Sequence, residues 1–190
     1  MTTKPTVSEF SSVEHRAQAE ELLLEFGRFG VAFERVCEGM RHAILLIFVS
    51  EGLQNQGLAQ VVIGDKASAE LQVLLGALFV ELRARTDDAD SKAVQTLLKE
   101  VKALTEERNV VIHSAWRFGN SAAYSELYAT TVRPRTKQNK GAIPEIHGIS
   151  AQYLRQLTGR SNTLETELGS LRDALLQKDL KVAAVLNNPR

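Results

Sequence analysis

Apolar residues recur at steps of three and four along the first part of this chain, between Leu22 and Ile47. At these steps side chains share one face of an α-helix, so the pattern predicts a long helix with one buried face. Ser11 and Glu14 have the spacing of a capping box, which predicts that this helix begins near Ser11. The predicted buried face consists of Leu22, Leu23, Phe26, Phe29, Phe33, Val36, Met40, Ala43, Ile44 and Ile47.

The same spacing predicts two further helices, over residues 67–85 and 92–115. Near the C-terminus, Ser150 is predicted to cap a fourth helix, which Gly159 is expected to interrupt. Thr163 is expected to cap a last helix after this interruption. Helices joined by short connections form bundles. The sequence therefore predicts an all-α fold, an antiparallel bundle of about four to six helices.

The segment between the third and fourth predicted helices has a different pattern. Residues 128–132 are rich in β-branched and aromatic side chains and predict a short strand, which Pro134 should end. A basic loop over residues 135–140 would then lead to a return strand. We expect a small β-hairpin insertion near 117–145, within a single domain of 1–190 that has flexible ends at 1–10 and 187–190 and an insertion or loop at 117–149.

Cysteine usage and hydropathy limit the compartment and the cofactors. Cys37 is the only cysteine, so an intrachain disulfide and a cysteine-rich metal site are excluded. The polar N-terminus lacks the apolar core of a signal peptide, and the longest apolar run is much shorter than the ~20 residues that cross a bilayer. We therefore expect a cytoplasmic protein with no membrane span, no metal and no cofactor.

Charge is unevenly distributed although the formal net charge is zero. Residues 1–116 hold 12 Lys and Arg against 17 Asp and Glu, whereas residues 117–160 hold seven basic residues against two acidic ones. This second segment is where a polyanion such as RNA would bind, although a solvated charged loop would have the same composition. The candidate RNA-binding residues are Arg117, Arg133, Arg135, Lys137 and Lys140.

The third predicted helix contains the one chemically suggestive group of residues in the chain. Asn109 and His113 are four apart, so they lie on one helix face and can touch. Arg108 continues the apolar stripe of that helix. A guanidinium cannot be neutralised, so placing it there is costly unless an anion, a carboxylate or an open cleft receives it. We therefore expect this helix to border a groove at Arg108.

Histidine moves protons at neutral pH, and arginine holds a phosphate or a charged transition state through two parallel hydrogen bonds. Together they are the parts of a metal-free ribonuclease. The 2′-hydroxyl of RNA would attack the adjacent phosphate while His113 moves a proton, Arg108 stabilises the developing charge and Asn109 orients the imidazole or the phosphate. Arg108, Asn109 and His113 are thus the candidate catalytic residues.

In sequence, Glu107 to Trp116 reads Glu-Arg-Asn-Val-Val-Ile-His-Ser-Ala-Trp, with the motif R-N-x-x-x-H late in a helical chain. It resembles the HEPN family. The resemblance implies a homodimeric helical bundle in which two such helices face each other across a shared cleft. It also implies metal-independent endoribonuclease activity, frequently in toxin–antitoxin or anti-phage defence systems, with an antitoxin or regulatory protein as a further partner.

Two other interpretations remain open at this stage. On the same fold, the polar residues could bind a nucleotide, RNA or another protein without cleaving anything. Alternatively, the chain is a structural helical oligomer in which Arg108 forms a buried ion pair and His113 is incidental. This last interpretation predicts a carboxylate against Arg108 and no cleft at His113.

Overall fold

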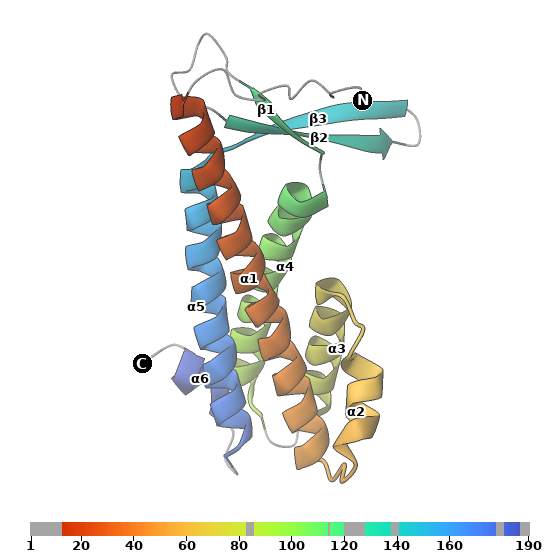
Figure 1. Ribbon diagram of the computed structural model, residues 1–190. Coiled ribbons are helices and arrows are strands. Elements are labelled where there is room, and N and C mark those ends of the chain that lie inside the picture. The colour runs from red at the N-terminus through yellow and green to blue at the C-terminus, as the bar shows by residue number, and fades with distance from the viewer. Residues whose placement is uncertain are drawn as a thin grey trace, which may run out of the picture.

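The computed structural model describes residues 13–82, 86–113, 115–119, 128–137, 141–177 and 181–186 (Figure 1). Six helices and one three-stranded sheet occur in this part of the chain, so the predicted helical bundle is confirmed. The helices are α1 (Val13–Ser50), α2 (Gln56–Ile63), α3 (Ser68–Glu81), α4 (Asp88–His113), α5 (Ala151–Leu175) and α6 (Val182–Leu186). The strands are β1 (Ala115–Gly119), β2 (Tyr128–Lys137) and β3 (Gly141–Ile149).

Successive helices from α1 to α5 alternate in direction, as expected for an antiparallel bundle (Figure 1). α1 and α5 therefore run the same way, and they form the most extensive helix pair in the described structure. Two ion pairs agree with this parallel arrangement. Arg155 contacts Glu21 near the start of both helices, and Arg35 contacts Glu165 further toward the C-terminal end of both helices. The sheet lies between α4 and α5 in the chain and supplies the reversal of direction (Figure 1).

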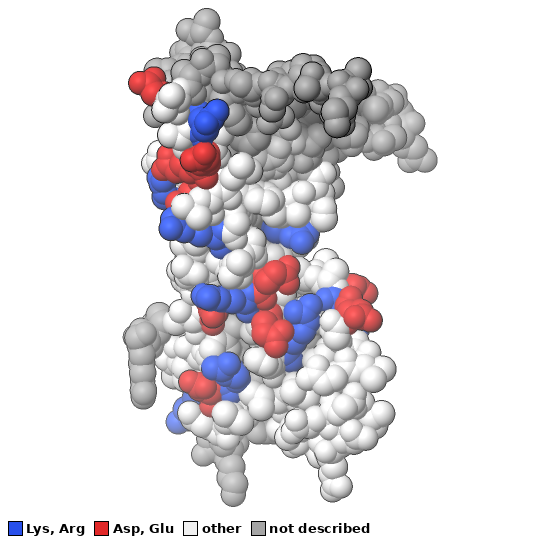
Figure 2. Space-filling model, in the orientation of Figure 1, with Lys and Arg blue, Asp and Glu red and all other residues white. Residues whose placement is uncertain are grey.

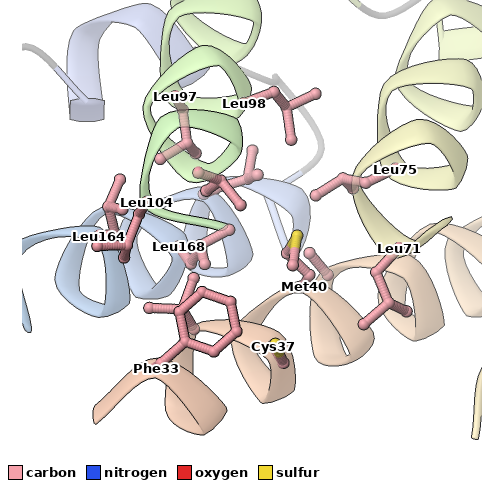
Figure 3. Close-up of a cluster of buried hydrophobic side chains, with 14 of the residues drawn as sticks. Phe33, Cys37, Met40, Leu71, Leu75, Leu97, Leu98, Leu104, Leu164 and Leu168 are labelled. Atoms are coloured by element: carbon pink, nitrogen blue, oxygen red, sulfur yellow. The ribbon is translucent and has the colours of Figure 1, made fainter. Parts of the chain in front are cut away.

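The hydrophobic core lies where α1, α3, α4 and α5 meet, and each helix contributes leucine, isoleucine, phenylalanine or methionine side chains (Figure 3). Burying a side chain of this size is worth about 1.5–3 kcal/mol, so this cluster supplies most of the driving force for folding. Nearly all of the predicted inward face of α1 is buried. Leu23 is the exception, because its side chain is 52% exposed.

Gly39 explains how α1 and α5 approach each other closely. A Cβ atom built at Gly39 would lie 3.1 Å from the Cβ of Leu168 on α5. Leu168 is buried in the core, so it has little room to move away. The glycine at this position permits the contact between the two helices.

The sheet has the order β1-β2-β3 with antiparallel pairs, so the expected hairpin is present and carries an additional strand. Pro134 does not end β2, contrary to the sequence prediction, because it pairs in register with Pro144 of β3. Neither proline has an N–H to donate, and the pairing continues on both sides of them, between Arg133 and Glu145 and between Arg135 and Ile143. The predicted strand over 128–132 therefore continues to Lys137.

Two other local predictions were wrong. Gly159 does not interrupt α5, because buried leucines on both sides of it, Leu157 and Leu164, hold the helix in the core, and the glycine lowers only its local stability. Thr163 is consequently not a cap, and its hydroxyl donates within the helix to the carbonyl of Gly159. Ser150 is the true cap of α5, with its side chain accepting a hydrogen bond from the backbone of Tyr153.

The start of α4 and the segment before α3 also differ from the sequence prediction. α4 begins at Asp88, one turn earlier than predicted, and the Asp87 and Asp90 side chains exchange hydrogen bonds with each other's backbone N–H. Residues 56–63, where no helix was predicted, form α2 with Asn55 as its cap. No helix among the described residues is both long and apolar enough to cross a membrane.

Candidate functional site

The last two turns of α4 bring the three candidate residues together. Nη1 of Arg108 lies 3.2 Å from Oδ1 of Asn109 and 2.7 Å from Nε2 of His113. A guanidinium only donates hydrogen bonds, so Nε2 of His113 is the acceptor and carries no proton in this arrangement. The arginine thus orients the imidazole through its Nε2 atom.

The geometry differs in one respect from the sequence argument, which paired Asn109 with His113. Among the described residues, the partner of His113 is Arg108, five positions earlier. Helical position places these two Cα atoms on different faces, but the arginine side chain is long enough to cross the helix surface. Arg108 therefore holds both other members of the motif through one nitrogen.

Arg108 is half-buried and rests on an aromatic ring of α1. Its guanidinium carbon lies 5.4 Å from the centre of the Phe33 ring, within the range of a cation–π contact. Within the described part of the chain no carboxylate lies within 4.0 Å of this guanidinium. The buried ion pair that the structural-oligomer interpretation predicted is therefore not found in this part of the chain.

A pocket of about 210 Å³ opens beside these residues. It lies between the middle of α1, the start of α3 and the C-terminal half of α4, so the expected groove at Arg108 is present. Its walls are formed by Phe33, Glu34, Cys37, Arg41, Lys66, Ala67, Ser68, Ala69, Thr105, Arg108, Asn109 and His113.

The floor of the pocket is fixed by contacts between the three helices. The hydroxyls of Ser68 and Thr105 lie 2.9 Å apart and join α3 to α4, and Thr105 also donates to the carbonyl of Val101. Burial raises the pKa of the Cys37 thiol, and Glu34 raises it further, against smaller lowering effects from Ser68 and from the cations nearby. Cys37 is therefore a neutral thiol that packs in the core rather than a nucleophile.

The residue before Arg108 attaches the same turn of α4 to α5. Oε2 of Glu107 accepts a hydrogen bond of 2.6 Å from the Tyr153 hydroxyl, and Oε1 accepts one of 2.5 Å from Arg160. Burial raises the pKa of Glu107, but hydrogen bonds from Tyr153 and Arg160 and the charge of Arg160 outweigh it and lower that pKa. Burial and Glu107 together raise the pKa of Tyr153. Glu107 is therefore ionised, and its hydrogen bonds hold α4 against α5.

Trp116 follows the motif but packs in the bundle. Its indole N–H donates to the carbonyl of Val111 at 2.7 Å, and its ring meets Phe26 edge-on with 4.8 Å between centroids. Both contacts attach the first residues of β1 to α1 and α4. The core role that is usual for an apolar residue at a helix end is thus the one observed.

The structure describes only part of the basic segment over residues 117–160. Arg117 occupies β1, Arg133, Arg135 and Lys137 occupy alternate positions of β2, and the sheet lies at the end of the bundle where α4 ends (Figure 1). Their side chains, and the whole of Lys140, lie outside the described residues. The two other basic residues of this segment are neutralised by ion pairs, Arg155 with Glu21 and Glu25 and Arg160 with Glu107.

Arg41 and Lys66 are pocket residues that the sequence argument missed. They lie on α1 and in the connection before α3, far from Arg108 in the chain, and neither is part of a spaced motif. Only the folded arrangement brings them to the same pocket. Among the described residues, no group of three or more His, Cys, Asp and Glu side chains is arranged to hold a metal ion.

Comparison with known proteins adds no assignment. No protein-family model, curated protein or solved structure matches the chain.

Proposed function

We propose that this protein is a HEPN-like endoribonuclease that cleaves RNA without a metal ion, by attack of the 2′-hydroxyl on the adjacent phosphate. The observation that carries the proposal is the contact between Arg108 and Nε2 of His113 at the edge of a pocket, with no carboxylate against the guanidinium in the described structure. An arginine that is left without an anion, beside an imidazole in its basic form, is equipped for phosphoryl transfer.

Each residue has a distinct part in the proposed reaction. Nη1 of Arg108 is occupied by Asn109 and His113, whereas its Nη2 and Nε bond to no described residue. That free edge is the one that can grip two phosphate oxygens. Nε2 of His113 takes the proton of the 2′-hydroxyl as the O2′–P bond forms. The P–O5′ bond then breaks, the imidazolium returns the proton to the departing 5′ oxygen, and a 2′,3′-cyclic phosphate remains.

The homodimer that the family resemblance implies would use the outer face of α2 and α3. Leu58, Val61 and Val73 are 57%, 85% and 73% exposed there. The surface over α2 and α3 carries almost no charged side chains in Figure 2. Ala67 and Ser68 at the start of α3 also line the pocket, so a second copy that extended over this end of α3 would lie next to the pocket. Its apolar, uncharged character suits pairing with an identical face.

The proposal also implies partners and a setting. RNA is the substrate, and the basic residues Arg117, Arg133, Arg135, Lys137 and Lys140 are proposed to hold its backbone. An antitoxin or another regulatory protein would restrain the activity in the cytoplasm, as the resemblance to toxin–antitoxin and defence ribonucleases implies.

One observation favours a second candidate, a HEPN-fold module that binds a nucleotide, RNA or a protein without cleavage. Nε2 of His113 is the nitrogen that would take the proton, and it is already engaged by Arg108. A binding module needs only the cationic pocket, whereas a nuclease must release this nitrogen when the substrate arrives.

The test is incubation of the purified protein with a labelled RNA pool in EDTA, alongside Arg108→Ala and His113→Ala. Glu106→Gln is a matched control, because Glu106 lies on the same helix, is exposed, and lines no part of the pocket. All variants are first compared for helical content and oligomeric state.

We expect the wild type and Glu106→Gln to cleave RNA and to leave 2′,3′-cyclic phosphate ends, while both site variants lose activity by at least 100-fold, the range for a general base. Equal cleavage by wild type and variants would exclude this site. RNA binding that depends on Arg108 but never leads to a cut product would establish the binding module instead.

A further inference from the structure

The part of the pocket lining contributed by α1 and the start of α3 is also cationic. Arg41 of α1 and Lys66, just before α3, line it together with the first residues of α3. Glu34 is the one acidic residue in the pocket lining, against the three permanent cations Arg41, Lys66 and Arg108. The lining residues therefore carry two positive charges in excess, which attract an anion, and Glu38 and Glu70 beside Arg41 and Lys66 offset part of this charge from outside the lining.

Arg41 is only partly satisfied by the protein. Its Nη2 donates to the backbone carbonyl of Lys66 at 3.3 Å, and its Nη1 lies 3.5 Å from Glu38. Its Nε is buried and has no hydrogen-bond partner in the described structure. A buried donor left without an acceptor is costly, so a small movement of the Arg41 side chain that brings this N–H to an oxygen atom of a ligand would be favoured.

Lys66 and the start of α3 complete this wall. The ammonium group of Lys66 lies 3.8 Å from Glu70, a long and weak contact that leaves its charge largely available. The cap of α3 is Ala67, whose side chain cannot accept a hydrogen bond from the first turn, while the Glu70 carboxylate accepts one of 3.0 Å from the Ala67 N–H. The remaining backbone N–H groups of the first turn add to the cationic character of Arg41 and Lys66, and Glu70 offsets part of it.

We propose that Arg41, Lys66 and the first turn of α3 form a phosphate-binding subsite, which holds a phosphate of the RNA strand next to the one that is cleaved at Arg108 and His113. The identity of that phosphate as part of RNA rests on the function proposed above, whereas the anion subsite itself does not. Arg41 and Lys66 would then fix the strand so that the reacting phosphate meets the free edge of Arg108. They are binding residues and take no part in proton transfer.

Inorganic phosphate is the first probe, titrated calorimetrically into the whole protein. Lys66→Met should weaken phosphate binding about fivefold, as expected for loss of one unit charge at about 4 Å under near-aqueous screening. Lys102→Met is the matched control, because Lys102 is exposed on α4 and lines no part of this pocket. Glu34→Gln should tighten binding about two- to threefold, because it removes the one acidic group of the pocket lining.

The opposite signs at Lys66 and Glu34 distinguish the subsite from a folding defect, since a damaged variant cannot bind phosphate more tightly. Equal affinities for the wild type, Lys66→Met and Glu34→Gln would overturn the subsite. Arg41→Lys is a second check, because it keeps the charge and removes the buried Nε, and it should also weaken binding.

Short RNA analogues with 2′-O-methyl riboses, which cannot be cleaved, then identify the source of the phosphate. A trinucleotide should bind several-fold more tightly than a dinucleotide, and Lys66→Met should remove this advantage. Equal binding of the two analogues would refute the RNA assignment even where inorganic phosphate responds to Lys66. A phosphate response without any RNA cleavage would leave the subsite standing and reject the nuclease, so the two failures are distinguishable.

Discussion

Replacing Glu107 by glutamine should destabilise the fold by about 1–2 kcal/mol at neutral pH. The carboxylate accepts hydrogen bonds of 2.6 Å and 2.5 Å from Tyr153 and Arg160. Charge-assisted hydrogen bonds are worth about 1.5–3 kcal/mol when buried, but the Glu107 side chain is 33% exposed and solvent screens the pair. Glutamine also keeps one acceptor oxygen. For a domain of this size, the expected loss lowers Tm by about 2–8 °C.

The pH dependence of this loss follows from the lowered pKa of Glu107. Burial alone would raise that pKa above the ordinary value of 4.5, but Tyr153 and Arg160 hold it below. A carboxyl whose pKa is lowered by folding stabilises the folded state fully above its unfolded pKa and loses that effect as the pH falls through the folded value. The difference between wild type and Glu107→Gln should therefore narrow below about pH 4.5.

Urea unfolding followed by circular dichroism at pH 7, 5 and 4 measures this difference. Glu106→Gln is the control, because Glu106 is the neighbouring exposed residue and has no ion pair within the described structure. Equal stability of the two variants at pH 7 would refute the anchoring role of Glu107. A difference that persists unchanged in acid would show that shape, rather than charge, causes the loss.

Four further predictions use other parts of the fold. Gly39→Leu should destabilise the protein by about 1–3 kcal/mol in thermal unfolding, because a Cβ at this position meets Leu168 at 3.1 Å. Gly27→Ala should instead stabilise α1 by about 0.5–1 kcal/mol, because nothing lies within 4 Å of a Cβ built there. Burial and Glu34 raise the pKa of Cys37, so alkylation at pH 7.5 should be much slower than in the urea-unfolded chain, and equal rates would contradict the buried position. Burial and Glu100 raise the pKa of Glu167, so Glu167→Gln should increase the stability of the protein at pH 7 by about 0.5 kcal/mol. This gain should disappear in acid, where the wild-type carboxyl is protonated and therefore uncharged, as glutamine is. Val73→Asp should shift the protein toward monomer in light scattering, whereas Val31→Asp, on the exposed face of α1, should not, and equal effects would exclude α2 and α3 as the dimer face.

Helical periodicity was enough to predict the main helices because their buried faces are long and regular. α1 and α4 needed no tertiary information, since each shows a continuous apolar stripe. The predicted interruption of α5 at Gly159 and the predicted end of β2 at Pro134 were wrong, because the structure around each residue outweighs its own conformational preference. The surrounding contacts of α5 keep Gly159 helical, and the paired strand places Pro144 opposite Pro134.

The candidate site was predictable only along one helix. Arg108, Asn109 and His113 could be placed together from their spacing, although the reach of the arginine side chain was underestimated. Arg41 and Lys66 could not be associated with them, because the contact depends on how α1 and the start of α3 pack against α4. A motif within one element is visible in a sequence, whereas the walls of a pocket made from three elements are not.

Stability and proposed chemistry are divided between consecutive residues of α4. Glu107 points to α5, where Tyr153 and Arg160 hold it, and Arg108 points to the pocket between α1 and α3. Because adjacent helical residues lie about 100° apart, one turn can be anchored on one side and open on the other. Glu107 therefore fixes the turn that carries Arg108, while Arg108 is left without a carboxylate among the described residues. An ion pair at Arg108 would stabilise the bundle, but it would also fill the site that a phosphate is proposed to occupy.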